Sequence, residues 1–140
     1  MHVQVHTDGG SRGNPGPAAA AAVVTDKAGN VLHRAGIFLG TATNNVAEYH
    51  GLLTGLMAAA GVGACHVQVL SDSELLVRQM NGQYRVRNAG LRPLFEKARG
   101  LSERFDRCEF THVRRERNEV ADALVNEALD LRRNVGDAAD

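Results

Sequence analysis

The chain has 140 residues, of which 44% are hydrophobic, and its 16 lysines and arginines balance 16 aspartates and glutamates. This length and apolar content predict one globular domain with a buried core and exclude a disordered chain. The longest run of small or apolar residues, 17–24, is too short to span a bilayer, and nothing before Asp8 resembles a leader peptide. We expect a cytoplasmic protein with one domain over residues 1–135 and a frayed tail at 136–140.

The zero net charge hides a basic segment. Residues 75–99 hold six lysines and arginines against a single carboxylate, Glu96. Basic side chains bind nucleic-acid phosphates by releasing counterions, so this segment is compatible with a nucleic-acid partner. A solvated helix face is the more ordinary explanation, and charge alone favours it.

Alternation of apolar and polar residues predicts a first strand over 2–8, with Asp8 at its end. Residues 9–17 are dense in glycine and proline and predict a loop, after which a hairpin joins strands over 18–25 and 31–39. The first three strands should therefore form an antiparallel meander. Leucines at helical spacing then predict a helix over 47–60.

The second half alternates strands and helices. We expect a valine-rich strand at 66–71, helices at 73–80 and 91–105, a strand at 108–113, and a last helix at 119–132 with Asn118 as its N-cap. This order predicts an α/β fold in which parallel strands, joined by helical crossovers, extend the meander into a mixed sheet flanked by helices. Cys65 and Cys108 lack metal-type spacing, so we expect reduced thiols and assign them no role.

Four carboxylates occupy unusual positions. Asp8 and Asp72 end predicted strands, while Glu48 and Asp122 border the apolar stripes of predicted helices, so the fold can bring all four around one point. Like charges that close together raise one another's pKa values unless a cation joins them. Oxygen ligands without histidine or cysteine select Mg²⁺ or Mn²⁺. Taken singly, each carboxylate could instead cap a helix, offset a helix dipole or simply be exposed.

Four motifs occur in an order and spacing that together resemble ribonuclease HI: TDGGSRGNPGP at 7–17, TNNVAE at 43–48, SDS at 71–73 and NEVADAL at 118–124. The resemblance runs from residue 3 to about residue 132. It implies the RNase H-like fold, with a five-stranded mixed sheet, and an endoribonuclease that hydrolyses the RNA strand of RNA–DNA hybrids. It further implies a two-metal mechanism with Mg²⁺, or Mn²⁺ in its place, that leaves 5′-phosphate and 3′-hydroxyl ends. The implied catalytic and metal-binding residues are Asp8, Glu48, Asp72 and Asp122.

The same resemblance implies a set of residues that bind the hybrid. Glycines in the first loop let the backbone approach nucleic acid closely, and short polar side chains can contact the wide minor groove. Asparagines are also ordinary in turns and helix caps, which is the competing explanation. The expected minor-groove contacts are Asn14, Asn44 and Asn45, with Thr43 and Asn88 on a DNA-strand phosphate and Gly10, Ser11 and Arg115 completing the set.

Two departures from the family pattern affect these expectations. Many relatives carry a histidine in the loop before the last aspartate, whereas residues 113–117 here read VRRER. Our hypothesis is that Arg115 or Arg117 takes the place of this histidine. Because arginine keeps its proton, it would contribute a positive charge and would not act as a general base. The basic protrusion of some relatives is also missing, so Arg85, Arg87 and Arg92 must hold the hybrid, and we expect weak, strongly salt-dependent binding.

Two alternatives remain open. The chain could be another nuclease of the same superfamily, such as a transposase core or a reverse-transcriptase-associated domain. It could also be a binding module for RNA–DNA hybrids without catalysis. A binding module gains nothing from four carboxylates that face a polyanion, so the enzyme is favoured. We expect a monomer without an obligate protein partner.

Overall fold

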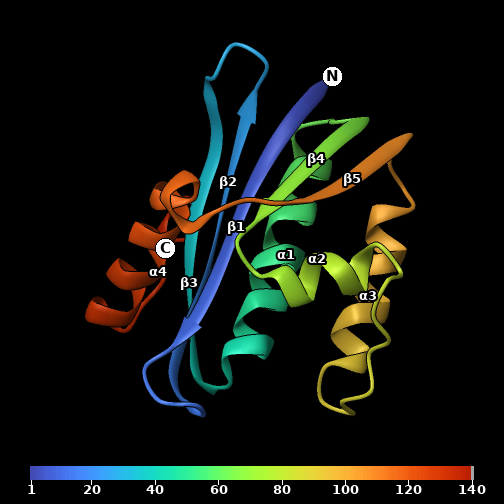
Figure 1. The fold of residues 1–140 in the computed structure, drawn as a ribbon. Helices are drawn as coiled ribbons and strands as arrows, with labels where there is room; N and C mark the ends of the chain where they lie inside the picture. The colour runs from blue at the N-terminus through green and yellow to red at the C-terminus, as the bar shows by residue number, and fades with distance from the viewer. Residues whose placement is uncertain (140) are drawn as a thin grey trace.

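The computed structural model describes residues 1–139, and in that range a mixed sheet carries helices on both faces (Figure 1). Its strands are β1 (His2–Ser11), β2 (Gly16–Asp26), β3 (Val31–Ala42), β4 (His66–Ser71), β5 (Arg107–His112) and β6 (Val135–Gly136). Its helices are α1 (Asn44–Gly61), α2 (Glu74–Met80), α3 (Arg92–Ser102) and α4 (Glu119–Leu131), with a 3₁₀ turn, η1, at Arg115–Arg117.

The strand order is β5-β4-β1-β2-β3-β6. Strands β1, β2 and β3 form the predicted antiparallel meander, and β4 and β5 extend it in parallel from β1. The predicted mixed sheet is confirmed, and so is the order of the expected elements. Because β1 lies beside β4 with Thr7 paired to Ser71, Asp8 within β1 lies level with Asp72, the residue directly after β4.

The sheet has a sixth strand where five were expected. Val135 and Gly136 pair with β3, and the main chain of Asp137 donates a hydrogen bond to the carbonyl oxygen of Arg34. The Asp137 carboxylate also accepts the main-chain N–H of Arg34 at 2.9 Å. The first two residues of the expected frayed tail are therefore tied to β3, while residue 140 lies outside the described range. A two-residue strand has no periodicity, so the sequence carried no sign of it.

The loop expected at 9–17 shrinks to residues 12–15. Strand β1 continues through Gly9 and Gly10, which pair with alanines of β2. Gly9 is needed here for close packing, because a Cβ at this position would overlap the backbone of Ala47 and Glu48 in α1. Glycines that usually signal a turn thus serve a helix-on-strand contact inside a regular strand.

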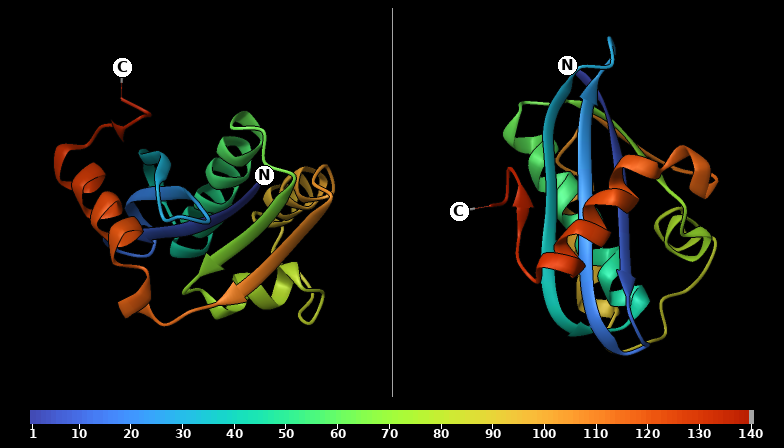
Figure 2. Two further views of the ribbon diagram at one scale, coloured as in Figure 1. Left: turned by 90° about the horizontal axis from the view of Figure 1, so that it is seen from above. Right: turned by 90° about the vertical axis from the view of Figure 1, so that its left-hand side faces the viewer.

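The alanines of β2 are buried on both faces of the sheet. Ala18 to Ala22 have no exposed surface, with α1 packed on one side and α4 on the other (Figure 2). Alanine favours helix by propensity, and burial on both faces overrides this preference. Small side chains here keep both helices close to the centre of the sheet.

The helices divide unequally between the two faces. Helices α1, α2 and α3 share one apolar core behind β1, β4 and β5, whereas α4 alone covers β2 and β3 from the other side. Pro93 lies in the first turn of α3, where its missing N–H costs no helical hydrogen bond. Both cysteines are free, as expected, and both are partly buried. Among the described residues, no helix has the length and apolar character needed to cross a membrane.

Candidate active site

The four predicted carboxylates come from four elements and meet where β4 ends beside β1. Asp8 lies in β1, Glu48 early in α1, Asp72 directly after β4 and Asp122 in the first turn of α4. One carboxylate oxygen from each of the first three lies within 4.8 Å of the other two. Asp122 approaches from the opposite face of the sheet, and it is near enough to raise the pKa of Asp8. All four line a single hollow.

Close backbone packing sets Glu48 beside Asp8. A Cβ on Gly51 would overlap the carbonyl oxygen of Asp8, just as one on Gly9 would overlap α1. Only glycine at both positions allows the helix to lie directly on the strand. Two glycines on different elements therefore fix the separation between these two carboxylates.

The electrostatics of this cluster are unfavourable without a cation. Burial, followed by the charge of Asp72, raises the pKa of Asp8 to about 7. Burial, and then the charges of Asp8 and Asp72, raises the pKa of Glu48 well above its ordinary value. The buried Oε1 of Glu48 accepts no hydrogen bond from any residue in the range 1–139. These carboxylates offer only oxygen ligands, repel one another and include an oxygen without a partner. Such a group suits a hard divalent cation, which would offset the repulsion and bind the unpartnered oxygen.

A polar network joins the loop after β1 to the start of α1. The main-chain N–H of Ser11 donates to Oδ1 of Asn44 at 2.8 Å, and the N–H of Asn44 donates to Oδ1 of Asn14 at 3.1 Å. In residues 1–139 neither asparagine's amide nitrogen donates a hydrogen bond. The network therefore leaves two amide donors free beside the hollow, next to the exposed Asn45.

Two of the predicted substrate-binding residues have local structural roles. Thr43 caps α1, where its hydroxyl oxygen accepts the N–H of Val46 at 3.2 Å. Asn88 closes the turn before α3 by accepting the N–H of Gly90 at 2.7 Å and that of Leu91 at 3.2 Å. Neither side chain lines the carboxylate hollow.

The structure separates the two arginines proposed to replace the loop histidine. Arg115 lines the carboxylate hollow, and its charge acts to lower the pKa of Glu48 against the larger effects that raise it. Arg117 lines a different hollow, together with His6 and Val120. Arg115 is therefore the arginine placed to act on the carboxylates.

The hollow also contains residues that the sequence did not indicate. Asn126 lies one helical turn after Asp122, so its spacing could have pointed to it. Arg12 forms an ion pair with Asp130 at 2.6 Å, which joins the loop after β1 to α4. No sequence pattern links those two residues.

The basic segment forms a separate hollow between α2 and α3. Arg85 and Arg92 line it together with Arg99 and the half-exposed Tyr84. Arg87, the third arginine expected to hold the hybrid, does not line it. The segment thus presents a basic, partly aromatic surface.

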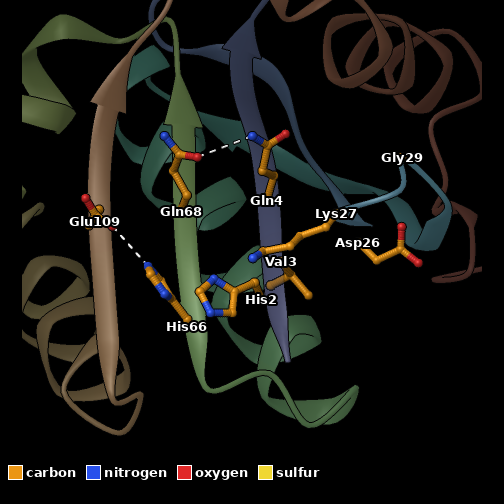
Figure 3. Close-up of a pocket in the computed structure, with 9 residues that line it drawn as sticks. All are labelled: His2, Val3, Gln4, Asp26, Lys27, Gly29, His66, Gln68 and Glu109. Atoms are coloured by element: carbon orange, nitrogen blue, oxygen red, sulfur yellow. Dashed lines mark hydrogen bonds and ion pairs between the residues drawn. The ribbon is translucent and has the colours of Figure 1, made fainter.

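Another polar hollow lies on the open face of the sheet near the start of β1 (Figure 3). Two pairs of its polar side chains contact each other: Nε2 of His66 lies 3.0 Å from Oε1 of Glu109, and Gln4 donates to Gln68 at 3.3 Å. The carboxylate cluster, by contrast, keeps an unpartnered buried oxygen. It therefore remains the candidate active site.

The comparisons with known proteins agree with this geometry. The family described as "Reverse transcriptase-like" matches residues 6–128. A bifunctional protein of Mycobacterium tuberculosis is 47% identical over 131 residues, which are 93% of this chain and 36% of that protein. Ribonuclease HI of Halobacterium salinarum is 44% identical over 128 residues, 91% of this chain and 64% of the relative. The chain thus spans less than two thirds of either relative.

The solved structures show the same fold over nearly the whole chain. RNase H1 from Halobacterium salinarum superposes with a TM-score of 0.90 at 43% identity, over 93% of this chain and 98% of that one. LC11-RNase H1 in complex with an RNA/DNA hybrid gives a TM-score of 0.88 at 42% identity, over the same shares. The expected RNase H-like fold is confirmed. With its four motifs in order and its carboxylates gathered where β4 ends beside β1, the chain belongs to the ribonuclease HI family.

Proposed function

We propose that this protein is an endoribonuclease that hydrolyses the RNA strand of RNA–DNA hybrids and leaves 5′-phosphate and 3′-hydroxyl ends. The observation that carries the proposal is the cluster in which one carboxylate oxygen each of Asp8, Glu48 and Asp72 lies within 4.8 Å of the other two, while the buried Oε1 of Glu48 has no hydrogen-bond partner among residues 1–139. Membership of the ribonuclease HI family supports the same chemistry, and a relative has been solved with an RNA/DNA hybrid.

The four carboxylates would hold the metal. Asp8, Glu48, Asp72 and Asp122 offer only oxygen ligands, which suits two Mg²⁺ ions, with Mn²⁺ as an alternative. Bound divalent ions supply an activated water and neutralise charge on the scissile phosphate and its leaving 3′ oxygen. The chain contributes the geometry, because Asp8 is fixed in β1, Asp72 directly follows the adjacent parallel strand β4, and Glu48 and Asp122 lie on helices packed against opposite faces of the sheet.

The rim of the hollow would bind the minor groove of the hybrid. The free amide groups of Asn14 and Asn44, with the exposed Asn45, can donate to base edges and sugar hydroxyls. Ser11 and Gly10 would lie against the backbone of the RNA strand. These side chains would bind the 2′-hydroxyl groups of the RNA strand near the carboxylates, which would confine cleavage to that strand.

Two further groups of side chains, one of hydrogen-bond donors and one of arginines, would contact phosphates of the hybrid. Thr43 and Asn88 use acceptor oxygens for their local hydrogen bonds, so the Thr43 hydroxyl and the Asn88 amide nitrogen can still donate to a DNA-strand phosphate. Arg115 would act on the phosphate near the carboxylates, while Arg85 and Arg92 would hold the duplex further away. We further propose that the protein acts as a monomer without an obligate protein partner.

A cleavage assay tests this function. Labelled RNA–DNA hybrid is incubated with Mg²⁺ and the wild-type protein, the Asp8→Asn variant, or Asp106→Asn as a control with an exposed aspartate outside the site. We expect short RNA fragments with 5′-phosphates from wild type and control, and none from Asp8→Asn or in the presence of EDTA. Binding of the hybrid without metal-dependent cleavage would identify a binding module instead.

A further inference from the structure

Asn118 is a buried amide tied to the strand that carries Asp8. Its side chain is 1% exposed, and its Nδ2 donates to the main-chain oxygen of Thr7 at 2.9 Å. Thr7 directly precedes Asp8 in β1, while Asn118 directly precedes α4. This one hydrogen bond therefore connects two elements that each carry a carboxylate of the site.

The amide does not serve the role that the sequence predicts for it. Asn118 occupies the N-cap position of α4, yet its side chain makes no capping hydrogen bond. Its Oδ1, the atom that would cap the helix, is buried and has no partner among residues 1–139. Burial of an unpartnered oxygen is unfavourable, so the benefit of this asparagine lies in the bond that its nitrogen makes to β1.

The main chain of Asn118 lies between two groups of the site. Its carbonyl oxygen accepts the N–H of Asp122 at 3.1 Å, and its N–H donates to the carbonyl oxygen of Arg115 at 2.9 Å. The tether to Thr7 therefore holds the first turn of α4 and the η1 turn together. Displacement of Asn118 would move both Asp122 and Arg115.

Asp122 is the carboxylate that needs such a tether. Asp8 and Asp72 are held by neighbouring strands, and Glu48 is held by the glycine contacts of α1. Helix α4 packs on the alanines of β2 through small and branched apolar side chains, and its other polar links to the β1–β3 region, the exposed Arg12–Asp130 ion pair and the Asn134 hydrogen bond to Phe38, lie at the end of the helix far from Asp122. Apolar packing of this kind is not directional, so by itself it fixes the position of a helix along a strand only loosely.

We propose that Asn118 is a positioning residue, whose hydrogen bond to the Thr7 carbonyl sets the separation between Asp122 on α4 and Asp8 on β1. The inference rests on the proposed function of the carboxylates. Asn118 touches neither substrate nor metal in this role. Asn118 sets the position of Asp122, and the position of Asp122 in turn affects the affinity of the site for divalent cations and the rate of turnover.

Two substitutions separate the tether from the cap. Asn118→Ser keeps a hydroxyl that can cap α4 but is too short to reach Thr7, and Asn118→Ala removes both functions. For both variants we expect kcat about tenfold lower, with KM for the hybrid within about twofold of wild type. The substrate-free variants should also bind Mn²⁺ about threefold or more weakly in a titration followed by electron paramagnetic resonance.

Asn134→Ala is the matched control at the other end of α4. Oδ1 of Asn134 accepts the main-chain N–H of Phe38 at 3.0 Å, so this variant also loses a hydrogen bond between the α4 region and the sheet. We expect its melting temperature to fall, while its Mn²⁺ affinity and kcat stay at wild-type values. An equal loss of kcat in Asn134→Ala would show general loosening of α4 and overturn the inference.

The serine variant decides the outcome if Asn118→Ala does not fold. A folded Asn118→Ser protein with kcat and Mn²⁺ affinity within about twofold of wild type would overturn the positioning role. Asp8→Asn, measured in the same Mn²⁺ titration, tests the underlying site. If Asp8→Asn binds Mn²⁺ and cleaves like wild type, the proposed function fails; if it loses both while Asn118→Ser does not, only the positioning role fails.

Discussion

Removal of one charge from the carboxylate cluster should stabilise the protein when no metal is bound. The pKa of Asp8 is raised from 3.8 to about 7, first by burial and then by the charges of Asp72 and Asp122. The Asp8→Asn substitution keeps the shape of the side chain and removes its charge. At pH 8 the wild-type protein must hold this buried charge, whereas the variant does not.

The magnitude follows from the pKa. A rise of roughly three pKa units corresponds to about 4 kcal/mol at 1.36 kcal/mol per unit, which is an upper bound because the neighbouring carboxylates can move apart. The new amide also lacks a full set of partners, so we expect a net gain of about 2 kcal/mol at pH 8. For a domain of this size that gain corresponds to a melting temperature roughly 6 °C higher.

The pH dependence has a definite sign. Between pH 3.8 and about 7 the folded protein holds a proton on Asp8 that the unfolded chain releases, so the free energy of unfolding falls as the pH rises through this window. Thermal melts in EDTA at pH 5 and pH 8 measure the effect. Wild type should lose more stability than Asp8→Asn between these two values, and Mg²⁺ added at pH 8 should restore wild type more than the variant.

Asp106→Asn, which changes an exposed aspartate, is the control and should match wild type at both pH values. A lower stability of Asp8→Asn than of wild type in EDTA at pH 8 would contradict a destabilising buried charge on Asp8. Identical pH profiles for wild type and Asp8→Asn would refute it as well, because the buried charge would then have no measurable effect on the free energy of unfolding.

Three further predictions concern packing, electrostatics and substrate affinity. Gly9→Ala should separate α1 from β1, lower the free energy of unfolding by roughly 2 kcal/mol or more in urea titrations, and abolish cleavage. Arg115→Ala should lower turnover more than about threefold while Arg117→Ala stays within that range; turnover within that range for both would remove the electrostatic role. Hybrid affinity should fall steeply with salt, and Arg85→Ala and Arg92→Ala should each reduce the slope of log K against log salt by about 1; a flat dependence for wild type would contradict the role of the basic segment.

The sequence predicted the parts of the site that depend on periodicity. Asp72 directly follows its strand as expected, whereas Asp8, expected at the end of the first strand, lies within β1, which continues to Ser11. Helical spacing placed Glu48 and Asp122 near apolar stripes, so the gathering of these carboxylates could still be anticipated. The type and order of the elements followed from the same patterns; the strand at 66–71 has its predicted bounds, and other bounds moved by up to three residues.

The hydrogen-bond partners of individual polar side chains could not be predicted from the sequence. Asn118 was expected to cap its own helix and instead donates to Thr7, which is distant in the sequence. Thr43 and Asn88 were expected to face substrate and also satisfy nearby main-chain groups. A short amide or hydroxyl can satisfy several donors or acceptors, and tertiary packing decides which of them comes within reach.

The alanines of β2 limit how far this protein can be stabilised by filling its core. Larger side chains at Ala19 or Ala21 would bury more apolar surface, a common route to higher stability. They would also thicken the sheet under α4 and carry Asp122 away from Asp8. The small residues thus act as a spacer whose width is matched to the site. Selection for a more stable core at these positions would trade directly against turnover, whereas exposed positions such as Val31 and Val120 are free of that conflict.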